Sequence, residues 1–132
     1  MKEFCSIVNI ASGAGLKSSP GLSQYCAGKR GVIAMTCAVA NEYARHNITV
    51  NAICPEAYDT ALYKDTPPDL EQLYADMMPQ GRIGNPIEAG HLALFLVSDM
   101  ARAVIGAAIP LDGGESGAAT APVKWSHPEI LD

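Results

Sequence analysis

The stretch Ile48-Thr-Val-Asn-Ala-Ile-Cys-Pro55 is rich in β-branched residues and ends at a proline, which predicts a strand over residues 48–53. Upstream, the apolar and β-branched run from Cys5 to Ala11 predicts a buried strand. Downstream, Ala107 to Leu111 predicts a third strand, which two consecutive glycines end. Three strands therefore frame this chain.

Three segments with helical patterning lie beside these strands, and they are residues 23–46, 70–78 and 86–98. Ser23, Asp69 and Asn85 are the expected N-caps, and Pro86 suits the first helical position. Strands that alternate with helices predict the order β-α-β-α-β, with right-handed crossovers and a parallel sheet. The fold class is therefore α/β.

Glycines and prolines divide these elements. The Gly/Ser/Pro-rich residues 12–22 predict a loop. Gly28 and Gly31 lie inside the first helix, where each costs about 1 kcal/mol relative to alanine. They suggest a close backbone approach near Tyr25 and Lys29, and a neutral packing reason fits equally well.

Composition narrows the classes of function. A length of 132 residues suits one domain with a modest core, and the net charge of −5 with scattered basic residues argues against nucleic-acid binding. The longest apolar stretch, residues 32–40, is too short to span a membrane, and residues 1–5 do not resemble a secretory signal. The four cysteines have irregular spacing, which predicts neither a metal site nor a disulfide framework. We expect reduced, mostly buried cysteines and a cytoplasmic location.

Ser12, Tyr25 and Lys29 are the candidate catalytic residues. Tyr25 and Lys29 are four residues apart, so on a helix they share one face. A nearby ammonium stabilises a phenolate, and such a tyrosine can give or take a proton at a carbonyl or alcohol oxygen. Ser12 can hold the same oxygen by a hydrogen bond. The chemistry indicated is the interconversion of a carbonyl and an alcohol.

The chain resembles the C-terminal half of the short-chain dehydrogenases/reductases over roughly residues 4 to 116. Five segments carry the likeness in the order and at the spacing of that family, and a lone Tyr-x-x-x-Lys would be a weak signal. These segments are Ser6-Ile-Val-Asn-Ile-Ala-Ser12, Tyr25-Cys-Ala-Gly-Lys29, Ile48-Thr-Val-Asn-Ala-Ile-Cys-Pro55, Gly81-Arg-Ile-Gly-Asn-Pro86, and Ile109-Pro-Leu-Asp-Gly-Gly114 after Leu94-Phe-Leu-Val-Ser-Asp99.

The resemblance implies a partial Rossmann-like fold, with the last three strands of a doubly wound parallel sheet in residues 1–116. Residues 117–132 show no periodicity, which predicts an irregular tail. The first strand would then be an open edge, because the strand with which it pairs in the family is absent here. The family's Thr-Gly-x-x-x-Gly-x-Gly phosphate-binding turn is also absent. Residues 13–18 imitate a glycine-rich turn, but Pro20 and the serines before it make a helix there unfavourable.

By resemblance, the substrate is a secondary alcohol or ketone and the cofactor is NAD or NADP, with no metal. Tyr25 would be the general acid/base, Lys29 would lower its pKa and hold the nicotinamide ribose, and Ser12 would orient the substrate oxygen. Tyr25 and Lys29 would also contact the cofactor, and Pro55, Tyr58 and Thr60 would contact its nicotinamide.

Two features of the resemblance remain open in the sequence. Glu56 stands where the family has a glycine, so it either bends the loop or disfavours the cofactor. Apolar residues would cover the substrate as a lid, although a surface helix explains them equally well; they are Tyr63, Leu73, Tyr74, Met77 and Met78. Without the phosphate-binding half, we expect weak cofactor affinity and little turnover. The alternative is a non-catalytic fragment that associates with itself or with another chain, and an oligomer is expected in either case.

Overall fold

The computed structural model describes residues 4–58 and 67–117. Within them, three strands form one parallel sheet in the order β1-β2-β3. They are β1 (Cys5–Ile10), β2 (Ile48–Pro55) and β3 (Ala108–Leu111). The parallel α/β prediction is confirmed. Strand β2 pairs on both sides and its six central residues are buried, whereas β1 is an edge strand with exposed Ile7 and Ile10 side chains.

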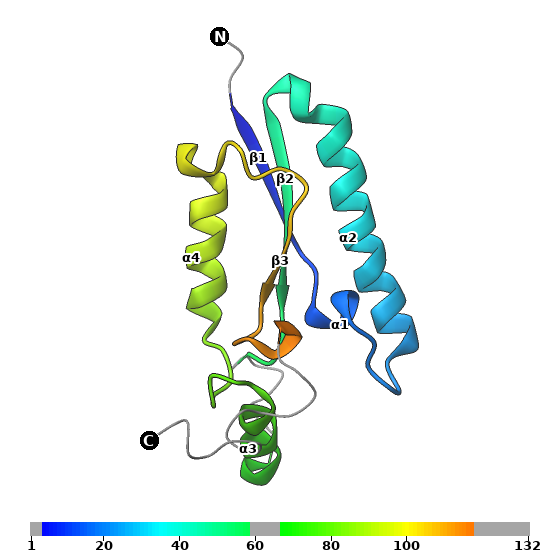
Figure 1. The fold of residues 1–132 in the computed structure, drawn as a ribbon, viewed down its shortest axis with the longest axis vertical. Helices are drawn as coiled ribbons and strands as arrows, with labels where there is room; N and C mark the ends of the chain where they lie inside the picture. The colour runs from blue at the N-terminus through cyan, green and yellow to red at the C-terminus, as the bar shows by residue number, and fades with distance from the viewer. Residues whose placement is uncertain (1–3, 59–66, 118–132) are drawn as a thin grey trace.

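Helices cover both faces of the sheet. Helix α2 (Ser23–Tyr43) lies on one face and α4 (Pro86–Val97) on the other, as Figure 1 shows. Because side chains alternate along a strand, β2 contributes to two separate cores. Ala52 and Cys54 pack with Ile33 of α2, whereas Ile53 packs with Leu96 of α4. This two-sided cover is what a parallel sheet requires.

Two further helices lie at the end of the sheet where β1 and β2 finish (Figure 1). Helix α1 (Gly13–Leu16) directly follows β1, in the stretch that the sequence predicts as loop. The loop prediction is wrong for these four residues because Ser12 caps them, its Oγ accepting a hydrogen bond from the Ala14 amide at 3.2 Å. Helix α3 (Pro68–Met77) buries none of its residues.

The N-cap prediction is confirmed for α4 and is wrong for α2 and α3. Asn85 caps α4 in a complete capping box with Glu88, as expected. Ser23 is the first residue of α2 and not its cap, since Leu22 holds that position without a side-chain hydrogen bond. Helix α3 begins at Pro68 after Pro67, so Asp69 lies in its first turn, where a carboxylate favours the helix dipole.

The cysteines are less buried than expected. Cys54 is buried in β2, where burial raises the pKa of its thiol, but Cys5 is exposed and the other two are partly buried. All four are free thiols. In the described ranges, no helix combines the length and the apolar character that crossing a bilayer demands.

Candidate active site

A cavity of about 930 Å³ opens at the carboxyl ends of β1 and β2. Its wall includes Ile10, the last residue of β1, and Pro55, the last residue of β2. Residues from α1, the start of α2, α3 and the start of α4 complete it. The crevice beyond the carboxyl ends of parallel strands is where open α/β sheets bind their ligands. All three candidate catalytic residues line this cavity.

Ser12 is held in place by backbone on either side. The Ala11 amide donates to the Ile53 carbonyl at 2.8 Å, which extends the pairing of β1 with β2 up to the serine. The Oγ of Ser12 accepts from the Ala14 amide, and the residue is only 9% exposed. A hydroxyl that accepts one bond still has its own hydrogen to donate. Ser12 therefore offers a fixed donor to an oxygen in the cavity.

Tyr25 and Lys29 lie in the first turns of α2 and share one face, as their spacing predicts. The Lys29 Nζ is 5.7 Å from the centroid of the Tyr25 ring, within the range of a cation–π contact. The same Nζ donates a hydrogen bond to the Ile10 carbonyl at 3.1 Å, which ties α2 to the end of β1. The Tyr25 ring is 48% exposed, so a ligand can reach it.

The close backbone approach near Lys29 occurs at Gly15, and not at the two glycines of α2. A Cβ at Gly15 would lie 2.9 Å from the carbonyl atoms of Lys29 and 3.0 Å from Cδ1 of Ile33. A Cβ at Gly28 or Gly31 would meet no atom of the described residues within 4 Å. The close approach suggested for Gly28 and Gly31 is therefore wrong. Gly15 lets α1 pack directly on α2 beside the site.

The structure describes two of the three residues that were expected to contact the nicotinamide. Pro55 and Tyr58 line the cavity, and Thr60 lies outside the described residues. The Tyr58 hydroxyl donates to the Leu111 carbonyl at 3.0 Å, and burial raises the pKa of Tyr58 to about 12. Its ring packs on Gly84, where a Cβ would lie 2.6 Å away. The phenol of Tyr58 is thus bound within the protein and stays neutral.

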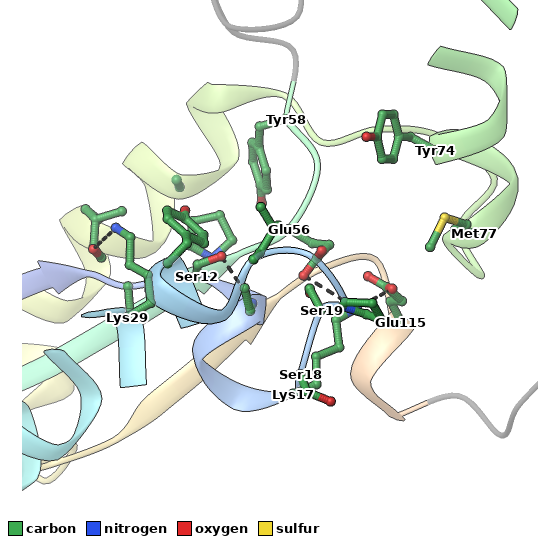
Figure 2. A pocket seen from close by; sticks show the side chains of 18 of the residues that line it. Ser12, Lys17, Ser18, Ser19, Lys29, Glu56, Tyr58, Tyr74, Met77 and Glu115 are labelled. Atoms are coloured by element: carbon green, nitrogen blue, oxygen red, sulfur yellow. Dashed lines mark hydrogen bonds and ion pairs between the residues drawn. The ribbon is translucent and has the colours of Figure 1, made fainter. Parts of the chain in front are cut away.

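The apolar lid is present in part. Tyr74 and Met77 of α3 line the cavity on the side away from Lys29 (Figure 2). Leu73 is 52% exposed and is not part of the wall, Met78 is buried outside it, and Tyr63 falls outside the described residues. Pro20 and Leu22, which sequence reasoning did not select, add further apolar wall.

Sequence reasoning singled out Glu56 but missed the group of charged side chains that it forms with Lys17 and Glu115 on the wall near Ser18 and Ser19 (Figure 2). The Lys17 Nζ is 3.6 Å from Oε2 of Glu56 and forms an ion pair with Glu115. Burial, reinforced by the charge of Glu115, raises the pKa of Glu56, while Lys17 acts in the opposite direction. The three residues are far apart in sequence, so no spacing could have revealed them.

The glycines of α1 do not form a phosphate cradle. A Cβ at Gly13 would lie 1.8 Å from Oε2 of Glu56, so the Glu56 carboxylate fills the space above Gly13. Gly15 faces the Lys29 backbone. Phosphate-binding glycines leave open backbone amides at the start of a helix, and these two are covered by protein. The two glycines of α1 thus leave no open cradle for a phosphate.

Comparison with known proteins gives consistent matches. A family model described as Enoyl-(Acyl carrier protein) reductase matches residues 1–116. The chain is 38% identical over 111 residues to 2,5-dichloro-2,5-cyclohexadiene-1,4-diol dehydrogenase LinX of Sphingobium indicum, covering 84% of the chain and 44% of that protein. It is 40% identical over 109 residues to 3-oxoacyl-[acyl-carrier-protein] reductase FabG of Thermotoga maritima, covering 83% and 44%.

A solved structure matches the fold. The chain superposes on a short chain dehydrogenase family protein from Francisella tularensis with a TM-score of 0.82 and 29% identity, covering 86% of this chain and 51% of that one. The chain thus spans about half the length of the proteins that it matches.

Proposed function

Because this chain belongs to the short-chain dehydrogenase/reductase family, we propose that it forms the catalytic half of an NAD(P)-dependent oxidoreductase acting on a secondary alcohol or ketone. One observation carries the proposal. Ser12, Tyr25 and Lys29 line one cavity at the carboxyl ends of the strands, with the Lys29 ammonium 5.7 Å from the Tyr25 ring.

In ketone reduction, the Tyr25 hydroxyl gives its proton to the substrate oxygen, and it takes the proton back in alcohol oxidation. The Lys29 ammonium favours the phenolate that this transfer creates. The Ser12 hydroxyl donates to the same substrate oxygen and fixes its position, since its Oγ is already anchored on the Ala14 amide. A bound nicotinamide supplies the hydride chemistry. Tyr25 and Ser12 therefore act on the substrate oxygen, and Lys29 acts through Tyr25.

The residues that would hold the nicotinamide end are Lys29, through the ribose, and Pro55 with the backbone near Tyr58. Thr60 remains a proposed contact to the carboxamide. Glu56 turns toward Lys17 and lies over Gly13, so its carboxylate is engaged within the chain. Nothing in the described residues selects NAD over NADP. We expect the chain alone to bind nucleotide weakly, because its described residues fit only one end of the cofactor.

Titration of the purified chain with NADH and NADPH, followed by nucleotide fluorescence, tests this proposal. Weak but saturable binding is expected, with at most slow turnover in a screen of secondary alcohols and ketones. Tyr25→Phe is expected to keep the binding and abolish the turnover. Tyr43→Phe is the matched control, because Tyr43 lies on the same helix with its ring against His46 and does not line the cavity. Absence of binding up to millimolar nucleotide would refute the proposal for this chain.

A second candidate function is non-catalytic association with another copy of the chain. The edge position of β1 favours it, because unpaired strand edges pair readily with other strands. Sedimentation of the chain without nucleotide tests this candidate. A stable dimer that binds no nucleotide would support association over catalysis, and a monomer would exclude it.

A further inference from the structure

Leu22 lies on the cavity wall at the start of α2, where local structure does not favour a leucine. It holds the N-cap position, at which side chains that accept a hydrogen bond are preferred, and it makes no side-chain cap bond. Its side chain is 49% exposed although it lines the cavity. Leu22 therefore neither caps the helix nor belongs to the core of the described residues.

The turn before α2 fixes the place of this side chain. The Leu22 amide donates to the Ser19 carbonyl at 3.1 Å, and the Leu22 carbonyl accepts from the Cys26 amide at 2.8 Å. Between Ser19 and Leu22, Pro20 precedes Gly21, whose φ is +82°. This order and this positive φ are typical of a type II β-turn, which requires the glycine. The backbone therefore holds Pro20 and Leu22 on the cavity wall.

Leu22 is also a neighbour of the proposed acid/base residue, because it precedes Tyr25 by three residues at the N-terminus of the same helix. Helical side chains lean toward the helix N-terminus, so the Tyr25 ring leans toward Leu22. Both side chains line the cavity together with Ser12. In the proposed reaction, Tyr25 and Ser12 hold the substrate oxygen. A group on the reacting carbon that points toward the start of α2 therefore meets Leu22.

The basic side chains on the described part of the wall are Lys17 and Lys29, and both are engaged within the chain. Lys17 forms ion pairs with Glu56 and Glu115, and Lys29 donates to the Ile10 carbonyl. A carboxylate that leaves water for an apolar wall without a partner loses solvation free energy. A hydrocarbon group at the same place gains free energy by burial. The wall around Leu22 therefore favours an uncharged group.

We propose that Leu22 is a specificity-determining residue, which selects ketones and secondary alcohols with an alkyl group on the reacting carbon over those with a carboxylate there. The proposal rests on the proposed function and names the substrate class for that same cavity. The alkyl group covers the Leu22 side chain, and each methylene buried in this way raises the affinity by up to about fourfold. Pro20 adds apolar surface to the same wall.

Binding of three ketone probes without nucleotide tests this assignment. The probes are butan-2-one, hexan-2-one and 4-oxopentanoate, in which a carboxylate replaces the terminal ethyl group of hexan-2-one. The readout is the methyl resonance of Met77, which lines the cavity. Hexan-2-one is expected to bind at least about fourfold more tightly than butan-2-one and at least about tenfold more tightly than 4-oxopentanoate. Equal binding of hexan-2-one and 4-oxopentanoate, or no response to any probe, would overturn the proposal.

Leu22→Ser separates the role in binding from a role in folding. Because Leu22 is half-exposed and makes no cap bond, the variant is expected to keep the urea midpoint of the parent chain. Its preference for hexan-2-one over 4-oxopentanoate is expected to fall to about threefold or less, since the apolar wall is lost. Leu94→Ser changes an exposed leucine of α4 outside the cavity wall and is the matched control, which is expected to keep the preference. An unchanged preference in Leu22→Ser would refute the assignment.

Leu22→Lys is expected to reverse the preference, because its ammonium attracts the carboxylate of 4-oxopentanoate. Tighter binding of hexan-2-one by this variant would contradict the assignment. Titration of the same samples with NADH distinguishes the two possible failures. A chain that keeps the ketone preference and binds no nucleotide would contradict the catalytic proposal alone. A chain that binds nucleotide and shows no ketone preference would contradict the assignment of Leu22 alone.

Discussion

Replacing Gly15 with alanine is expected to lower the free energy of unfolding by about 1 to 2 kcal/mol. The new Cβ would lie 2.9 Å from the Lys29 carbonyl atoms and 3.0 Å from Cδ1 of Ile33, so α1 and α2 must move apart. Overpacking of this kind costs about 1 to 3 kcal/mol, and the better helix preference of alanine returns up to about 1 kcal/mol. The carbonyl contact involves rigid backbone, which cannot give way as a side chain does.

Gly28→Ala is the matched control, because it makes the same change in the same region with open space around the Cβ. It is expected to raise the free energy of unfolding by up to about 1 kcal/mol through helix preference alone. Urea denaturation followed by far-ultraviolet circular dichroism measures both variants. The tight contact between α1 and Lys29 is refuted if Gly15→Ala has the same free energy of unfolding as the parent chain while Gly28→Ala has a higher one.

Two further changes test the packing around the site. The hydrogen bonds from the Arg82 guanidinium and the Asn85 amide lower the pKa of Glu88 from 4.5 to about 2, so their stabilisation is complete above pH 4.5 and is lost as the pH falls toward 2. In the Glu88→Gln variant, the free energy of unfolding should therefore fall less steeply as the pH drops through that window. The same steepness in the variant and the parent chain would contradict this. Tyr58→Phe should lower the free energy of unfolding by about 0.5 to 1.5 kcal/mol, because the Leu111 carbonyl loses its donor. Equal urea midpoints for Tyr58→Phe and its parent would show that the bond contributes nothing.

The strands and long helices were predictable because local chemistry specifies them. The β-branched residues before Pro55 marked β2, and Asn85-Pro86 marked the start of α4 together with its cap. Ser12 illustrates the limit of such reasoning. Its spacing from Tyr25 singled it out as a site residue, but a proline and serines downstream hid the short helix that it caps. A four-residue helix depends on packing, here against α2 through Gly15, and not on helix preference.

The parts of the site that sequence could not predict depend on contacts between distant segments. Lys17, Glu56 and Glu115 meet only after β2 and β3 have paired, and no motif links them. The glycine prediction failed for a related reason. Composition shows where a side chain is missing, but only the packing shows that Gly15 needs this absence and Gly28 does not.

Some residues of the cavity wall are close together in the sequence and others are far apart, and this difference sets the order in which the cavity assembles. Ser12, Tyr25 and Lys29 belong to one continuous β–α unit, so their arrangement depends on contacts of short sequence separation, which form fast. The Lys17–Glu56–Glu115 cluster closes a long loop and depends on the pairing of the last strand, which is slower. Partial opening at β3 would therefore disturb the Lys17–Glu56–Glu115 cluster first, and Ser12, Tyr25 and Lys29 would keep their places longest.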